Sequence, residues 1–109
     1  MKRIEAVVRR DKLSEVKRAM AAVPHLGFTA CDSTEQDSQS GTVLLCRGTK
    51  RLCDMTPRVS ISVLVDEVDA SAAVDAIVGA ARTGHAGDGT VVVVPVDEVV
   101  HISGAAAVA

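Results

Sequence analysis

The chain has 109 residues and a formal net charge of −2, a length that suits one compact domain. Twelve basic residues against fourteen acidic ones argue against a general nucleic-acid binder, and no apolar stretch approaches the roughly 20 residues that cross a bilayer. The start of the chain lacks the apolar segment of a secretory signal, so we expect a soluble cytoplasmic protein without direct membrane insertion.

A strand and a helix are predicted first. Apolar and charged residues alternate over 3–9, which predicts a half-buried strand. Apolar residues then recur at helical spacing over 13–23, which predicts an amphipathic helix with Asp11 as its N-cap. A short second strand is expected over 28–31.

The middle of the chain begins with a polar stretch. Residues 32–41 contain no apolar side chain, so we expect a solvated loop there. Residues 42–46 have the composition of a further strand, and a basic polar stretch follows at 47–51. Alternation returns over 59–65 and predicts a strand with Val, Ile, Val and Val on one face.

The last part repeats the order of helix and strand. A second helix is expected with Asp66 or Asp69 as its cap, and a glycine-punctuated turn follows it. The stretch 90–96 is almost wholly apolar, as in a strand that is buried on both faces, and a short apolar segment follows at 99–102. The predicted buried side of the second helix consists of Val68, Ala72, Val74, Ile77, Val78 and Ala81.

The order βαββαβ predicts one α+β domain over 1–109, with a ferredoxin-like antiparallel sheet and both helices on one face. The other face would expose aliphatic residues unless a partner covers it. The apolar residues are also small, since 19 Val and 16 Ala stand against one aromatic residue, Phe28. A core of this kind buries little area per side chain, so we expect further burial between copies of the chain.

Three glycines lie close together after the second helix, at Gly84, Gly87 and Gly89. Such a cluster can turn several backbone amides toward one anion. It can equally be a tight connection that needs positive φ angles. It is neither a Walker loop nor a dinucleotide fingerprint.

The run Thr-Gly-His-Ala-Gly-Asp-Gly at 83–89 resembles the nucleotide-binding B-loop of the P-II nitrogen-regulatory signalling family. The resemblance needs no gap over nearly the whole chain. It includes the start Met-Lys-Arg-Ile-Glu-Ala-Val-Val, Lys12-Leu13, Gly27, Gln39, Gly41, Arg47-Gly48, Asp54 and Pro57. It implies a homotrimer that senses an adenine nucleotide in clefts between subunits and has no enzymatic activity or permanent cofactor.

The resemblance also implies parts for individual segments. Residues 83–90 would form the phosphate loop and 37–55 an exposed docking loop for a membrane transporter or regulatory enzyme, with 103–109 as the C-terminal tail. Gln39 would contact a metal such as Mg²⁺ that joins ATP to 2-oxoglutarate, and Arg58 would hold that oxoacid. The positions assigned to the nucleotide are Thr29 (from the neighbouring subunit), Asp37, Ser38, Gln39, Leu64, Gly87, Asp88, Gly89, Thr90, His101 and Ser103.

Several basic phosphate contacts of the family are replaced. The positions concerned are Ser38, His85, Thr90, His101 and Ser103. Each charge-assisted hydrogen bond lost from a partly buried cleft removes about 1.5–3 kcal/mol. We therefore expect weak ATP binding, or a preference for ADP or AMP.

The docking loop also departs from the family. Arg51 stands where part of the family has a tyrosine that is uridylylated, and the chain contains no tyrosine. Lys50 and Arg51 suit an acidic partner, although an ordinary solvated loop would look the same.

Two alternatives stay open. Cys46 and Cys53 flank the middle of the docking loop, and thiolates suit zinc or copper(I), so the trimer could respond to metal or redox state. Six residues between two cysteines is not a recognised ligand spacing, however, and buried thiols are often purely structural. The second alternative is a trimer that binds no ligand. No residue context marks an activated nucleophile, so we expect no catalysis.

Overall fold

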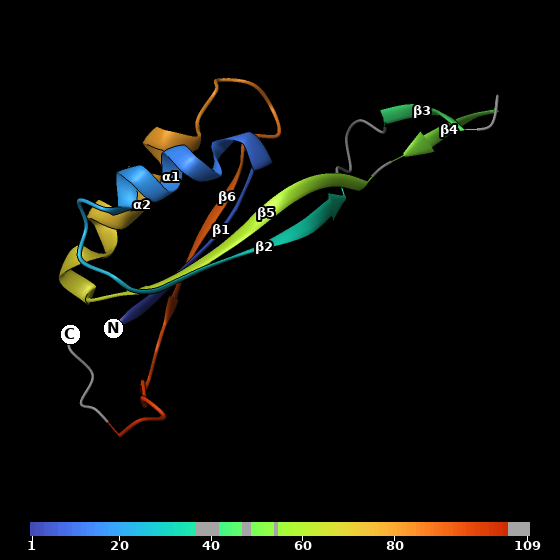
Figure 1. Cartoon of the computed structure of the whole chain (residues 1–109). Coiled ribbons are helices and arrows are strands. Elements are labelled where there is room, and N and C mark those ends of the chain that lie inside the picture. Colours follow the sequence, from blue (N-terminus) through green and yellow to red (C-terminus); the bar gives the residue numbers. More distant parts are fainter. Residues whose placement is uncertain (37–41, 47–48, 54, 105–109) are drawn as a thin grey trace.

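The computed structural model describes residues 1–36, 42–46, 49–53 and 55–104, with the backbone alone for 42–46 and 49–53. These residues form two α-helices and six strands, and a short 3-10 turn precedes each α-helix (Figure 1). In chain order the elements are β1 (Lys2–Val8), η1 (Arg10–Lys12), α1 (Leu13–Met20), β2 (Leu26–Gln36), β3 (Thr42–Cys46), β4 (Thr49–Cys53), β5 (Met55–Val65), η2 (Glu67–Asp69), α2 (Ala70–Ala81) and β6 (Gly89–Pro95).

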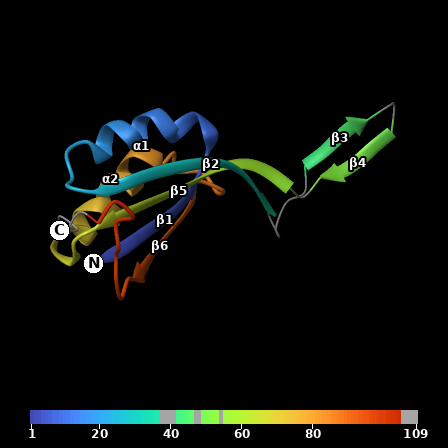
Figure 2. The same ribbon diagram turned by 60° about the horizontal axis from the view of Figure 1, so that its bottom comes forward.

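Four strands form the main sheet in the order β2-β5-β1-β6, and each neighbouring pair is antiparallel. Helices α1 and α2 lie together on one face of this sheet (Figure 1). The predicted ferredoxin-like α+β architecture is therefore confirmed. Strands β3 and β4 form a separate antiparallel pair that lies beyond the ends of β2 and β5, away from the helices (Figure 2).

The core lies between the sheet and the two helices. Alternate residues of β1 and β5 point into it, and the predicted period of two is confirmed at both strands. The buried apolar side chains are Ile4, Ala6, Val8, Val16, Met20, Val23, Val59, Ile61, Val63, Val65, Ala73, Ile77 and Ala81. No aromatic ring is among them, so the described core consists of small and medium aliphatic side chains.

Strand β2 is longer than predicted. Residues 32–36, expected as loop, continue the strand and pair with 55–59 of β5. The prediction was wrong because an edge strand is held by backbone hydrogen bonds and needs no apolar side chain on its solvent side. A register shift between Leu26 and Thr29, beside Gly27 at φ +60°, marks where the chain enters this strand.

Strand β6 lies at the opposite edge of the sheet. The prediction that both of its faces are buried was wrong for the single chain, because Val92 and Val93 are 49% and 43% exposed. Beyond β6, residues 96–104 form no strand, and Val100 and Ile102 of the predicted apolar segment are exposed. An apolar edge of this kind is typical of a surface that a partner covers.

The helix boundaries correct three smaller predictions. Asp11 lies inside the 3-10 turn before α1 and is not an N-cap, and the cap positions Asp66 and Asp69 make no side-chain capping hydrogen bond. Val68 and Ala72 are exposed, because α2 starts only at Ala70 and turns Ala73, Ile77 and Ala81 inward. Neither α-helix in the described part of the chain has the length and apolar composition needed to cross a bilayer.

Candidate functional site

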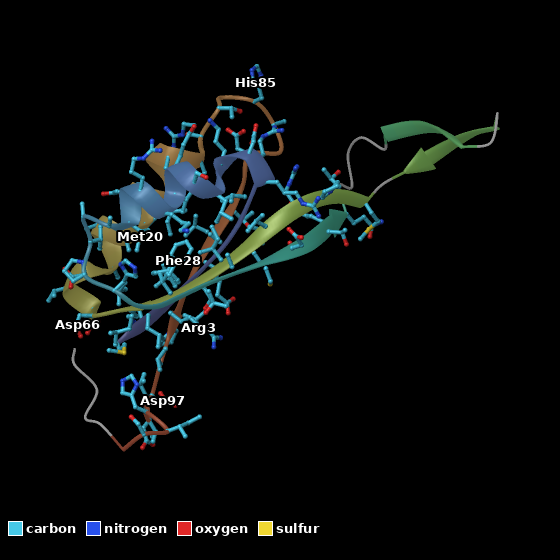
Figure 3. The ribbon with its side chains drawn as sticks, in the orientation of Figure 1. Arg3, Met20, Phe28, Asp66, His85 and Asp97 are labelled. Atoms are coloured by element: carbon cyan, nitrogen blue, oxygen red, sulfur yellow. The ribbon has the colours of Figure 1, made fainter. Side chains whose placement is uncertain are left out.

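The glycine-rich loop connects α2 to β6. The helix ends at Ala81, and Gly84, Gly87 and Gly89 all have positive φ angles, of 87°, 86° and 126°. A β-carbon at Gly89 would lie 1.9 Å from the Val7 carbonyl oxygen, so glycine is required where the loop meets β1. His85 lies at the outer end of the loop and points away from the sheet (Figure 3).

The carboxylate of Asp88 holds the loop in shape. It accepts hydrogen bonds from the backbone N–H of Thr83 at 2.7 Å and of Gly84 at 3.0 Å, and a further one from the Thr83 hydroxyl. These donors, with the Thr83 hydroxyl foremost, hold the pKa of Asp88 well below its usual range. Asp88 is therefore an anion inside the loop at neutral pH.

Arg9 reaches the loop from the end of β1. Its Nε donates to Asp88 at 3.2 Å, and its Nη2 donates to the carbonyl oxygen of Ala86 at 2.9 Å. Sequence reasoning missed this residue because it placed Arg9 at the end of the first predicted strand and assigned it no contact. The available signal was the sheet order, since Val8 pairs with Gly89 and so places the next residue beside the loop.

Arg58 of β5 also reaches this loop and is only 8% exposed. Its Nη2 donates to the Gly87 carbonyl oxygen at 2.9 Å, and its Nη1 donates to the Pro57 carbonyl oxygen at 3.3 Å. Its Nε lies 3.5 Å from Oε2 of Glu35. That Nε has no hydrogen-bond acceptor among the residues that the structure describes.

The two guanidinium groups converge on Gly87. A β-carbon at this glycine would lie 3.3 Å from Nη2 of Arg58 and 3.6 Å from Nη2 of Arg9. Two permanent cations thus border one face of a loop whose shape is fixed by its own aspartate. Phosphate and carboxylate oxygens are the acceptors that such paired guanidinium groups bind best.

Comparison with known proteins identifies the family of this chain. A family model described as "Nitrogen regulatory protein P-II" matches residues 1–105.

The chain belongs to the P-II family.

Among its relatives, the nitrogen regulatory protein P-II of Azospirillum brasilense is 40% identical over 102 residues, which cover 94% of this chain and 91% of that protein. The protein of the same name from Synechocystis is 37% identical with the same coverage. Nitrogen regulatory protein P-II 2 of Methanothermobacter thermautotrophicus is 38% identical, over 94% of this chain and 89% of that protein. Family membership identifies a signalling regulator.

The predicted adenine contacts of this P-II chain lie away from its own glycine-rich loop. Gly89 pairs with Val8, which in turn pairs with Val59, whereas Leu64 lies five residues farther along β5, about 16 Å at the usual rise per residue. Thr29 pairs with Ser62 in the edge strand β2. One chain therefore does not bring these side chains to the loop.

The predicted contacts after β6 lie farther still. Thr90 is exposed at the loop end of β6, but His101 and Ser103 follow the other end, where Pro95 pairs with Lys2. Figure 1 shows this last segment at the opposite end of the sheet from the loop. Within one chain, His101 and Ser103 therefore follow the end of β6 that is far from the glycine-rich loop.

Asp37, Ser38 and Gln39 lie outside the described residues, so their predicted contacts to nucleotide and metal stay predictions. Backbone pairing does place Cys46 opposite Thr49 and Cys53 opposite Thr42. The two cysteines thus lie at opposite ends of the β3–β4 pair, about 13 Å apart along the strands. That separation is too large for them to share one metal ion or a disulfide within a chain.

Proposed function

We propose that this P-II chain is a non-enzymatic regulator that binds an adenine nucleotide at its glycine-rich loop and converts occupancy into control of a target protein. The observation that carries the proposal is the convergence of Arg9 and Arg58 on Gly87. Asp88 fixes the loop around this point before any ligand arrives, which lowers the entropic cost of binding. A preformed loop with two guanidinium groups suits the phosphates of a nucleotide.

The cleft in this proposal is completed by neighbouring copies in a homotrimer. Thr29, Leu64, His101 and Ser103 are separated from the loop of their own chain, and assembly would bring equivalents from an adjacent subunit to it. The exposed valines at the β6 edge, Val92 and Val93, support such an assembly. Apolar residues at a sheet edge gain free energy when a second copy covers them.

The charge of the cleft favours a ligand with few phosphates. Thr90 and Ser103 cannot supply the positive charge that a triphosphate needs, and Arg9 and Arg58 already have Asp88 and Glu35 as counterions. We therefore infer a preference for ADP or AMP over ATP, with Mg²⁺ and Gln39 accompanying any ATP complex. Oxoacid binding at Arg58 and Gln39 would be weak.

Target control is assigned in this proposal to residues 37–55. Lys50 and Arg51 lie in β4, opposite Leu45 and Leu44 of β3, and give the segment positive charge that suits an acidic site on a transporter or regulatory enzyme. The chain has no tyrosine, so its control cannot depend on a tyrosyl modification. Occupancy of the cleft would act by favouring one conformation of this segment over another.

Titration calorimetry with AMP, ADP and ATP, each with and without Mg²⁺, tests the proposal. Wild type should bind ADP or AMP at least tenfold more tightly than ATP. Gly87→Ala should weaken this binding at least tenfold, because the new β-carbon would lie 3.3 Å from Nη2 of Arg58 and crowd the point on which both guanidinium groups converge. Gly27→Ala is the matched control, since Gly27 also has positive φ but a β-carbon there would meet nothing within 4 Å. The absence of binding by every nucleotide would overturn the proposal and favour a trimer without a ligand.

A further inference from the structure

The two arginines at the glycine-rich loop have counterions of very different character. Asp88, the counterion of Arg9, is fixed by Thr83 and Gly84 in addition to the arginine. Glu35, the counterion of Arg58, meets it through one contact, Oε2 to Nε at 3.5 Å, and its side chain is 40% exposed. One carboxylate is therefore built into the loop, whereas the other meets its arginine, among the residues that the structure describes, through a single contact between opposite charges.

The register between β2 and β5 explains why Glu35 contacts Arg58. Arg58 lies opposite Ser33, and Glu35 lies opposite Thr56. Glu35 is thus the diagonal cross-strand neighbour of Arg58 on the same face, a spacing that long side chains bridge readily. The contact follows from the strand pairing of β2 and β5.

Glu35 offsets the positive charge of Arg58 but does not accept a hydrogen bond from its Nε. Burial of a guanidinium group is costly unless an anion compensates its charge, and Arg58 is only 8% exposed. Yet its Nε donates to no acceptor in the described part of the chain. Because this Nε is itself buried, an external carboxylate could reach it only after Glu35, whose Oε2 lies 3.5 Å away, moves aside, since two carboxylates at one site would repel each other.

We propose that Glu35 is a specificity-determining residue that acts as an intramolecular carboxylate at Arg58, so that an oxoacid binds only by displacing it. The inference rests on the proposed function, because it concerns the anion specificity of the same cleft. Phosphate groups of a nucleotide at Gly87 would still meet Arg9, whose Nη2 lies 3.6 Å from the β-carbon position of that glycine. Glu35 thereby separates the response to nucleotide from the response to oxoacid.

The test is a calorimetric titration with 2-oxoglutarate of wild type, Glu35→Gln and the control Glu15→Gln, with and without saturating Mg·ATP. Glu15 also pairs with a basic residue, Lys12, but on α1 and away from the cleft. We expect Glu35→Gln to bind 2-oxoglutarate at least tenfold more tightly than wild type, and Glu15→Gln to match wild type. Glu35→Ala, which removes the carboxylate without leaving an amide in its place, should give the same gain and serves if Glu35→Gln folds poorly.

Equal or weaker binding of 2-oxoglutarate by the Glu35 variants would overturn the inference, and so would the absence of binding by all variants. Failure of the proposed function is a separate result, namely that wild type binds no nucleotide. In that case the titration without Mg·ATP still decides whether Glu35 competes with a carboxylate for Arg58.

Discussion

At the scale of single residues, Asp88 is the group in the described part of the chain whose ionisation the fold clearly alters. Its hydrogen bonds from Thr83, Arg9 and Gly84 lower its pKa in the folded chain, whereas an unfolded aspartate titrates at about pH 4. A group with a depressed folded pKa stabilises the fold fully above its unfolded pKa. That stabilisation is lost as the pH falls below it, toward the folded pKa.

Replacement of Asp88 by Asn should therefore change stability in a pH-dependent way. We expect the thermal unfolding midpoint of wild type to exceed that of Asp88→Asn by a constant amount above about pH 5, and the difference to shrink below about pH 4. Asp97→Asn, at an exposed position beyond β6, should show no such difference. A gap that widens toward acid pH would contradict the assignment of Asp88 as a loop anion.

The sequence alone allowed some residues of the site to be predicted, but not others. Asp88 and the loop glycines could be predicted from the sequence, because a cluster of glycines with an aspartate is a local pattern. Arg58 was named only through its family position, and its burial could not be predicted from a strand of alternating residues. Arg9 was missed because its partner, Ala86, lies 77 positions away in the chain, and only the sheet order brings the two together.

At the scale of elements, the decisive contact is the approach of the glycine-rich loop to β1. Gly89 begins β6 opposite Val8, and its backbone lies so close to Val7 that a β-carbon would clash with the carbonyl group. The loop and the edge strand are therefore positioned together. A change at Gly89 must shift the pairing of β1 and β6, and not only the loop.

We expect Gly89→Ala to destabilise the protein by more than about 2 kcal/mol, because backbone atoms would have to move. Gly84→Ala is the matched comparison, with φ +87° but open space around its β-carbon position, and should cost about 1 kcal/mol. Urea unfolding followed by circular dichroism measures both values. Equal losses in the two variants would show that the close approach to Val7 does not matter.

The elements themselves were predictable where one face of a helix or strand is buried. Periodicity identified β1, β5 and both helices, since each turns a regular set of aliphatic residues into the core. It failed at residues 32–36, where backbone pairing with β5 holds a polar strand. It also failed at β6, where the apolar run indicated burial that the single chain does not provide.

At the scale of the whole molecule, the exposed valines of β6 offer a surface through which copies of the chain could assemble. Val92 is 49% exposed and lies opposite Glu5, on the face that the helices do not cover. Assembly of three chains through this face would bury it and join the parts of the nucleotide cleft. The proposed trimer and the proposed nucleotide site therefore depend on the same contact between chains.

Val92→Lys should separate assembly from folding. A lysine there faces Glu5 across the strands and suits the isolated sheet, but it places a charge in the expected contact between copies. Light scattering should give wild type three times the 11.3 kDa of one chain and Val92→Lys a lower mass. Val68→Lys, at a valine that is 87% exposed in η2, should stay trimeric. A monomeric wild type would contradict this assembly.

The most direct test of the central claim is amide NMR of the assembled protein during titration with ADP. Binding at the glycine-rich loop predicts that the backbone N–H resonances of Gly84, Gly87 and Gly89 shift together and saturably, along with the Nε–H resonance of Arg9. Saturable shifts confined to other regions, or none at all up to millimolar ADP, would contradict it.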